Sequence, residues 1–194
     1  MKTKRFLRAL IVPAVAVTLA APAWAQTETS APGYATRGPA SEDPYTSSEL
    51  EAGRWITGAS MGFLGGTPDD TALAINGNAD YFIEDNVSIG PLLQFGVTDD
   101  MFQVGLSGQA KYWIPLEGTQ GRGKLSLQSG IGFAHADLLG NDTSWLVPLG
   151  IGYEHTTADG TNVTFTTFVN FTDLHPGPGA SADVMPGMAL GLRF

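Results

Sequence analysis

The sequence predicts an all-β protein: a closed, eight-stranded, antiparallel up-and-down β-barrel that crosses a membrane with its strands. From Trp55 onward, stretches of about ten to thirteen residues alternate between apolar and polar side chains, which is the two-residue period of a β-strand. Short polar or glycine-rich breaks separate these stretches. Within them, one set of alternate positions is apolar and contains no Asp, Glu, Lys or Arg, whereas the other set is small and polar.

Eight such stretches can be counted, and each is long for a strand of a soluble protein. A tilted strand needs about 9–11 residues to cross a bilayer, so these lengths suit a membrane. The breaks are too short for crossover connections, which makes neighbouring strands antiparallel. The predicted strands are 55–64, 71–83, 87–97, 102–114, 124–135, 144–155, 162–172 and 183–194.

Alternation alone does not decide which face points into the barrel, because a soluble lipocalin-like barrel would place the apolar set inside. The polar face decides against that alternative. A water-facing surface is typically about 25–35% charged, yet about forty polar-face positions hold only four ionisable residues. This face is also rich in glycine, as the interior of a narrow barrel requires. We therefore expect the apolar face to meet lipid.

Aromatic residues and prolines add detail to this prediction. Aromatic side chains gather near the strand ends, where they are expected to form two interfacial girdles. Three prolines, Pro91, Pro148 and Pro186, fall within strands although a closed barrel has no free edge. A β-bulge is predicted at Pro91.

The first 25 residues have the pattern of a cleaved signal peptide. A basic start precedes the uncharged apolar run 9–21, and small residues at Ala23 and Ala25 mark a cleavage site. The remaining chain keeps six basic residues against nineteen acidic ones, which argues against nucleic acid as a partner. The sequence contains no cysteine, so disulfides and thiolate metal sites are excluded. No cofactor is expected.

Two stretches resemble the small outer-membrane β-barrel family, which includes the OmpX-like proteins and the transmembrane domain of OmpA. Residues 80–91, DYFIEDNVSIGP, resemble that family's second strand, tight turn and third strand, and the ending 188–194, MALGLRF, resembles its C-terminal strand. The resemblance implies an outer-membrane barrel at 54–194 after a flexible periplasmic tail at 26–53. It also implies a monomer that contacts outer-membrane lipid and lipopolysaccharide.

The same resemblance implies an orientation with both chain ends in the periplasm. The outer loops would then be 65–70, 98–101, 136–143 and 173–182. The barrel-assembly machinery would recognise an assembly signal formed by Leu190, Leu192 and Phe194.

The four inward charges, Asp80, Lys111, Glu154 and Arg193, are the first candidate site. Each lies near the periplasmic end of an even-numbered predicted strand, and their signs alternate around the barrel. A buried charge without a partner costs several kcal/mol, so we expect the four to pair and to plug the lumen. The alternative is four separately solvated charges at a wet barrel mouth.

The outer loops are acidic and contain no Lys or Arg. One interpretation is a solvated rim; another is a surface where divalent cations bridge carboxylates to lipopolysaccharide phosphates, because Mg²⁺ and Ca²⁺ prefer such oxygen ligands. Candidate cation sites are Asp69, Asp70, Asp99 and Asp100, within the wider acidic set that also contains Asp137, Asp142, Asp173 and Asp183.

No pattern in the sequence predicts catalysis. The histidines, His135, His155 and His175, are not spaced as metal ligands or as a nucleophile–base pair. The expected function is therefore a non-catalytic, structural role in envelope integrity. Two alternatives stay open: a lipid-A-modifying enzyme, and a narrow porin-like conduit for small solutes. The polar lumen that would line such a conduit consists of Asn76, Asn78, Gln94, Gln103, Gln109 and Asn170.

Overall fold

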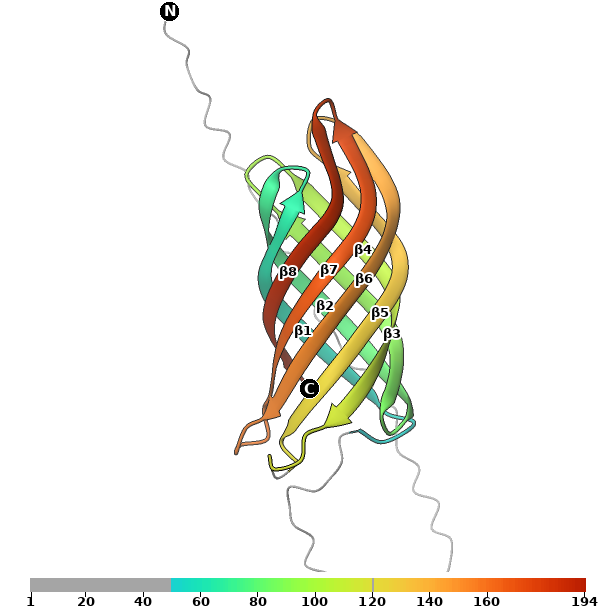
Figure 1. The fold of residues 1–194 in the computed structure, drawn as a ribbon, viewed down its shortest axis with the longest axis vertical. Coiled ribbons are helices and arrows are strands. Elements are labelled where there is room, and N and C mark those ends of the chain that lie inside the picture. The colour runs from blue at the N-terminus through green and yellow to red at the C-terminus, as the bar shows by residue number, and fades with distance from the viewer. Residues whose placement is uncertain (1–49, 120) are drawn as a thin grey trace, which may run out of the picture. The chain divides into compact units, whose positions relative to one another are not determined.

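The computed structural model describes residues 50–119 and 121–194, and these form a closed barrel of eight antiparallel strands (Figure 1). Each strand pairs with its neighbours in the chain, and β8 pairs with β1 to close the barrel. The predicted fold class is confirmed. The strands are β1 (Trp55–Thr67), β2 (Asp70–Glu84), β3 (Val87–Val97), β4 (Phe102–Pro115), β5 (Gly123–Asp137), β6 (Asn141–Thr156), β7 (Asn162–Gly177) and β8 (Ala180–Arg193).

Two predicted segments fall wholly or mostly outside this range. The signal peptide at 1–25 and residues 26–49 of the predicted tail lie outside the described residues. Within the described part of the chain, no helix is long and apolar enough to cross a membrane.

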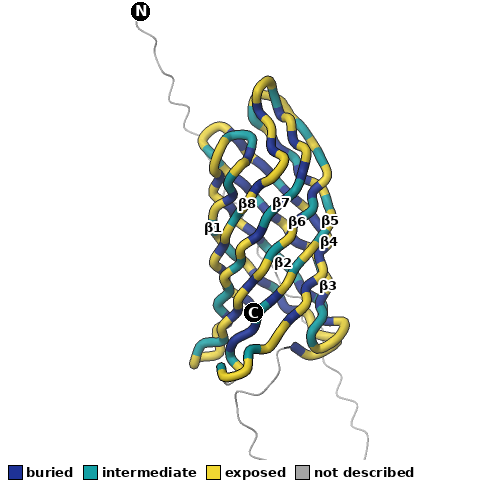
Figure 2. The backbone as a smooth tube through the Cα atoms, viewed as in Figure 1, coloured by how far each residue is buried: buried dark blue, intermediate teal, exposed yellow. Residues whose placement is uncertain are grey.

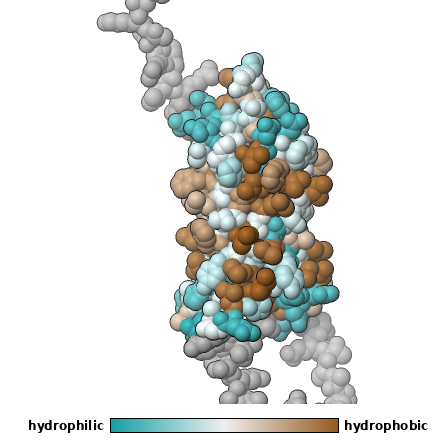
Figure 3. Space-filling model, in the orientation of Figure 1, coloured by the Kyte–Doolittle hydropathy of each residue, from teal (hydrophilic) through white to brown (hydrophobic). Residues whose placement is uncertain are grey.

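Buried and exposed residues alternate along the strands, as Figure 2 shows. In β5, Ile131 and Phe133 are 73% and 69% exposed, whereas Ala134 and Ala136 are buried. The large apolar side chains therefore point outward and the small and polar ones point into the barrel. This arrangement confirms the predicted face assignment and excludes a barrel with the apolar face inside. On the visible surface, hydrophobic side chains gather around the middle and hydrophilic ones at the two ends (Figure 3).

The two ends of the barrel differ in their connections. We call the end that carries the last residue, Phe194, and the connections 85–86, 116–122 and 157–161 the proximal end. The distal end carries the connections 68–69, 98–101, 138–140 and 178–179. At the distal end the β7–β8 hairpin reaches further than the β1–β2 hairpin (Figure 1).

The distal connections are shorter than predicted. The loop 98–101 is confirmed, but most of 65–70, 136–143 and 173–182 continues the strands. These segments are rich in Gly, Pro and Asp, residues typical of loops. They still pair because register shifts, such as those on both sides of Leu174, absorb the irregular residues. The last hairpin then turns at Pro178 and Gly179, where Gly179 has a φ of 79° that suits glycine.

The prolines within strands are accommodated without the predicted bulge. No register shift occurs at Pro91, so the bulge prediction is wrong. The β2–β3 ladder is instead interrupted beside Pro91, while the β3–β4 ladder runs through it. Pro148 shows the same arrangement between β5 and β6, and keeps its pairing with β7. Proline lacks the backbone N–H group, and in a sheet that group bonds to only one of the two neighbouring strands. Hydrogen bonding is therefore lost in only one of the two ladders.

Candidate functional site

Five charged side chains meet inside the barrel near its proximal end. We call them the lumen charge cluster: Asp80, Lys111, Lys124, Glu154 and Arg193. Each is at most 8% exposed. They come from β2, β4, β5, β6 and β8, and each occupies an inward position of its strand.

The charges form two linked groups. In the first, the Lys111 ammonium lies 2.9 Å from Asp80 Oδ2, which also accepts a 2.8 Å hydrogen bond from the Asn78 amide. In the second, Glu154 Oε1 lies 3.3 Å from the Lys124 ammonium, and Glu154 Oε2 accepts a hydrogen bond from Arg193 Nη1. The structure thus brings together Asp80 with Lys111, and Glu154 with Arg193. Each of these two pairs joins strands that are two positions apart in the barrel.

Lys124 is the member that sequence reasoning missed. It lies directly opposite Glu154 in the β5–β6 ladder. The outward positions of Leu125 and Leu127 imply by alternation that Lys124 points inward. That signal was available, but Lys124 follows a glycine-rich break and resembles a turn residue.

Two aromatic rings lie against the cluster. The Arg193 guanidinium carbon is 4.2 Å from the centroid of the Trp113 ring and 5.9 Å from that of Phe82. Lys111 Nζ also lies 5.9 Å from the Trp113 ring. The Trp113 indole N–H donates a 3.0 Å hydrogen bond to Ser88 Oγ, which fixes the ring. The faces of these rings are electron-rich and therefore favour the cations beside them.

The chain before β1 covers these aromatic rings. Leu50 is buried in an apolar cluster with Ile56, Phe82 and Trp113. A 2.7 Å hydrogen bond from Gly53 N to Phe82 O holds this segment against β2. Residues 50–53, the last of the predicted tail, therefore contribute to the closure of the proximal mouth.

The middle of the lumen is polar and almost full. Of the polar residues predicted to line it, Asn76, Gln94 and Gln109 are buried there. Gln103 and Asn170 are buried nearer the distal end, where Gln103 Nε2 lies 3.6 Å from Met185 Sδ and Asn170 pairs with Met185. A cavity of about 50 Å³ remains between this polar layer and the charge cluster. In the described residues, Asn76 Oδ1, Gln94 Oε1 and Arg193 Nε and Nη2 are among the buried polar atoms without a hydrogen-bond partner.

The distal part of the lumen holds an apolar layer that sequence reasoning did not predict. Leu146, Phe168 and Met185 belong to it, and each stands beside another apolar residue in the sequence. Such runs hide the inward member, because alternation cannot separate neighbours that are both apolar. The layer consists of Leu64, Ala74, Ala134, Ala136, Leu146, Phe168, Leu174, Ala182, Met185 and Ala189.

The acidic residues at the distal end make local contacts. Asp69 accepts a hydrogen bond from the Thr98 hydroxyl, and Asp142 accepts one from His175 N at 2.6 Å. The described residues contain no group of three or more His, Cys, Asp or Glu side chains that could hold a metal ion. Cation binding at Asp69, Asp70, Asp99 and Asp100 stays a prediction.

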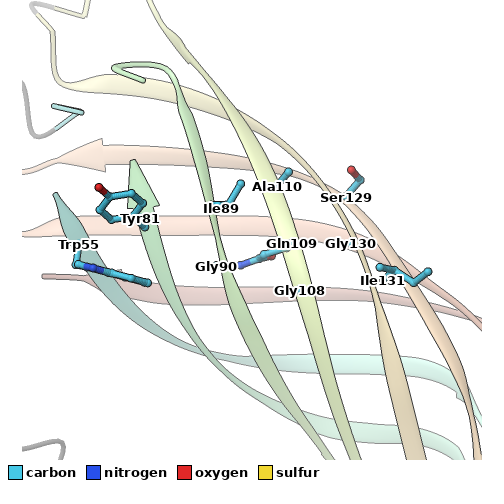
Figure 4. Close-up of a pocket in the computed structure, with 10 residues that line it drawn as sticks. All are labelled: Trp55, Tyr81, Ile89, Gly90, Gly108, Gln109, Ala110, Ser129, Gly130 and Ile131. Atoms are coloured by element: carbon cyan, nitrogen blue, oxygen red, sulfur yellow. The ribbon is translucent and has the colours of Figure 1, made fainter. Parts of the chain in front are cut away.

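Two further features lie on the outward face. His135 Nδ1 is 2.8 Å from the Thr143 hydroxyl across the β5–β6 ladder. A shallow depression of about 640 Å³ extends from β1 to β5 (Figure 4), where the outward positions are occupied by the small residues Gly108, Ala110 and Ser129. It is lined by Trp55, Tyr81, Ile89, Gly90, Gly108, Gln109, Ala110, Ser129, Gly130 and Ile131.

The predicted assembly signal lies at the proximal end of β8. Leu190, Leu192 and Phe194 point outward and are 60%, 46% and 71% exposed. Their recognition during assembly stays a prediction.

Known structures contain barrels of the same fold. The chain is similar to Neisserial surface protein A (NspA), with 15% sequence identity, a TM-score of 0.51, and coverage of 72% of this chain and 94% of that one. Weaker similarities, at TM-scores of 0.46 and 0.42, connect it with the N-terminal barrel domain of Pseudomonas aeruginosa OprF and with the outer membrane enzyme PagL. These two cover 72% of this chain at 14% and 12% identity, and 97% and 98% of their own lengths. No family model and no curated protein matches the sequence.

Proposed function

We propose that this protein stands in the outer membrane of a Gram-negative bacterium as a closed, non-conducting barrel with a structural role in envelope integrity and no catalytic activity. The observation that carries the proposal is the combination of an apolar outward face with a lumen occupied by buried side chains along its length. A soluble barrel would not expose an apolar outward face to water, and an open pore would not have its lumen occupied by side chains.

The outward face supports a lipid environment. Aromatic rings stand at two levels, one near each end of the strands. In β1, Trp55 and Phe63 are 62% and 60% exposed and eight residues apart. At about 3.3 Å per residue and a tilt of about 40°, they are separated by about 20 Å along the barrel axis. This height approaches the apolar band of about 25 Å that outer-membrane barrels present to lipid.

The filled lumen supports a barrel that does not conduct. A hydrated ion needs a continuous water-filled path, but buried charged, polar and apolar side chains occupy the lumen along its length. The cavity of about 50 Å³ beside Arg193 has room for only a few water molecules.

Recordings in planar lipid bilayers test the closed lumen. The full chain, inserted from vesicles, should give no steady conductance, whereas a large water-filled porin inserted in the same way should conduct. Protection of the strands from added protease in the same vesicles would establish insertion. Steady conductance of the inserted protein would contradict the proposal and favour the narrow conduit, for which the buried polar layer is the supporting observation.

The envelope role needs a test in cells. A strain that lacks the protein should become more sensitive to detergent, and expression of the full chain should restore resistance. Unchanged sensitivity would count against a role in envelope integrity. The lipid A mass spectrum should be the same in both strains, and a difference would instead indicate a lipid-A-modifying enzyme.

A further inference from the structure

The Arg193 side chain has hydrogen-bonding capacity that the described residues do not use. It is 5% exposed, and Nη1 donates to Glu154. Its other two nitrogens, Nε and Nη2, find no acceptor in the described part of the chain. A buried donor without an acceptor is costly, and more so when the group is charged. An occupant that accepts hydrogen bonds would remove this cost.

The carboxylates of the cluster do not supply that acceptor. Both oxygens of Glu154 already accept, one from Lys124 and the other from Arg193 Nη1. Asp80 Oδ2 accepts from Lys111 and from Asn78. Asp80 Oδ1 has no donor in the described residues, but Asp80 does not line the cavity that Arg193 lines.

The cavity beside Arg193 has the lining of an anion site. Its two charged lining residues are cations, Lys111 and Arg193. The amide groups of Asn78 and Gln128 and the hydroxyl of Thr166 also line it, and each of these groups can donate a hydrogen bond. Asn76 and Gln94 line it as well, and their Oδ1 and Oε1 atoms have no donor in the described residues. Because both cations are at most 8% exposed, their interactions in this space are screened less than those of surface charges.

We propose that this cavity binds one small monovalent inorganic anion of halide size, with chloride as the natural occupant. Water would accept the unused hydrogen bonds of Arg193, but an anion would accept them more strongly, because hydrogen bonds between a cation and an anion are about twice as strong as neutral ones. The volume of about 50 Å³ accommodates a chloride ion. The site is a property of the lumen and does not rest on the proposed function.

Crystallography with bromide tests the site directly. Crystals of the full chain, refolded and grown with bromide in place of chloride, should show an anomalous scattering peak within hydrogen-bond distance of Arg193 Nε and Nη2. A cavity that contains only water, with bromide peaks confined to the protein surface, would overturn the proposal.

Unfolding experiments in lipid vesicles test the affinity and the residues. Chloride is compared with gluconate, an anion too large for the cavity, at equal ionic strength. When chloride is at about ten times its dissociation constant, the unfolding equilibrium constant of the wild-type protein should fall about tenfold. Arg193→Lys keeps a cation for Glu154 but lacks the two unused nitrogens, so it should lose this chloride response. Equal responses of wild type and Arg193→Lys would contradict the site.

A threonine pair provides the matched control. Thr166 lines the cavity, whereas the next residue, Thr167, points outward. Thr166→Val removes a hydroxyl from the site and should weaken the chloride response several-fold, while Thr167→Val should retain the wild-type response. Indistinguishable responses of the two variants would count against the site even if Arg193→Lys did not fold.

Discussion

At the scale of single residues, Glu154 is the centre of the lumen charge cluster. It is 1% exposed, and its two oxygens connect Lys124 of β5 with Arg193 of β8. A carboxylate placed between two buried cations stabilises both of them, because neither is exposed to water. Its removal would leave buried charge uncompensated, which is more costly than the absence of the whole group of charges.

Glu154→Gln should therefore lower the free energy of unfolding by about 3–5 kcal/mol. The replacement keeps the shape of the side chain but removes its charge. Glu84→Gln is the control, because Glu84 is exposed at the proximal end of β2, and it should change the free energy by less than about 0.5 kcal/mol. Urea unfolding in lipid vesicles measures both values. Similar small changes in the two variants would show that the cluster does not stabilise the barrel.

The four inward charges could be predicted from the sequence because each is a charged residue on a strand face that otherwise consists of small and polar residues. Asp80, Lys111, Glu154 and Arg193 stand out among Gly, Ser, Thr and Gln, and strand alternation places them at one end. Lys124 was missed because it directly follows a glycine-rich break and resembles a turn residue, although it is the first residue of the predicted strand 124–135. Their aromatic neighbours, Trp113 and Phe82, could not be predicted, since inward aromatic residues look the same in a sequence as outward ones.

At the scale of the strands, close approach of backbones decides where glycine is required. A Cβ atom added at Gly132 of β5 would lie 2.0 Å from Leu106 O and 2.5 Å from the Cα of Ser107, both in β4. At Gly77 of β2, which points outward, an added Cβ would meet nothing within 4 Å. Glycine at the inward position 132 thus has a steric cause that is absent at the outward position 77.

Gly132→Ala should destabilise the barrel by about 1–3 kcal/mol, because the added methyl group forces β4 and β5 apart. Gly77→Ala places the same group in open space and should change the stability by no more than about 0.5 kcal/mol. The difference in the free energy of unfolding between the two variants is obtained from the midpoints and slopes of their urea unfolding curves. A larger effect at Gly77 would mean that the inward and outward faces have been confused.

Strand positions were predicted more accurately than strand ends. The range of β3 agrees at both ends, whereas β7 continues to Gly177, beyond the predicted end at 172. The reason is that Pro, Gly and Asp in the β7–β8 hairpin signal a loop locally. Pairing with β8 across register shifts outweighs that local preference, and pairing between distant segments cannot be read from either segment alone.

At the scale of the whole molecule, the barrel has an apolar exterior and a layered interior. The alternation of each strand predicted the exterior, and the inward charges predicted that the proximal end would be polar. The distal apolar layer was not predicted, because Leu146, Phe168 and Met185 each lie next to another apolar residue. Which of two apolar neighbours points inward depends on the register around the whole barrel.

The lipid environment can be tested with two leucines of the β5–β6 hairpin. Leu149 lies on the outward face of β6, and Leu139 lies at the distal turn and is 73% exposed. Leu149→Arg should cost about 2–4 kcal/mol because it places a charge in the apolar band. Leu139→Arg should cost about 0–1 kcal/mol because the turn lies outside that band. Unfolding from vesicles measures both, and equal small costs would argue against lipid around the outward face.

The most direct test of the central claim, a closed barrel that is embedded in lipid, is the gel mobility of the protein from an outer-membrane fraction. Samples in SDS are compared with and without boiling. A closed barrel joined by continuous hydrogen-bond ladders should resist SDS at room temperature, so the unboiled protein should migrate differently from the boiled chain. Recovery of the protein from the periplasm, with the same mobility before and after boiling, would contradict the account.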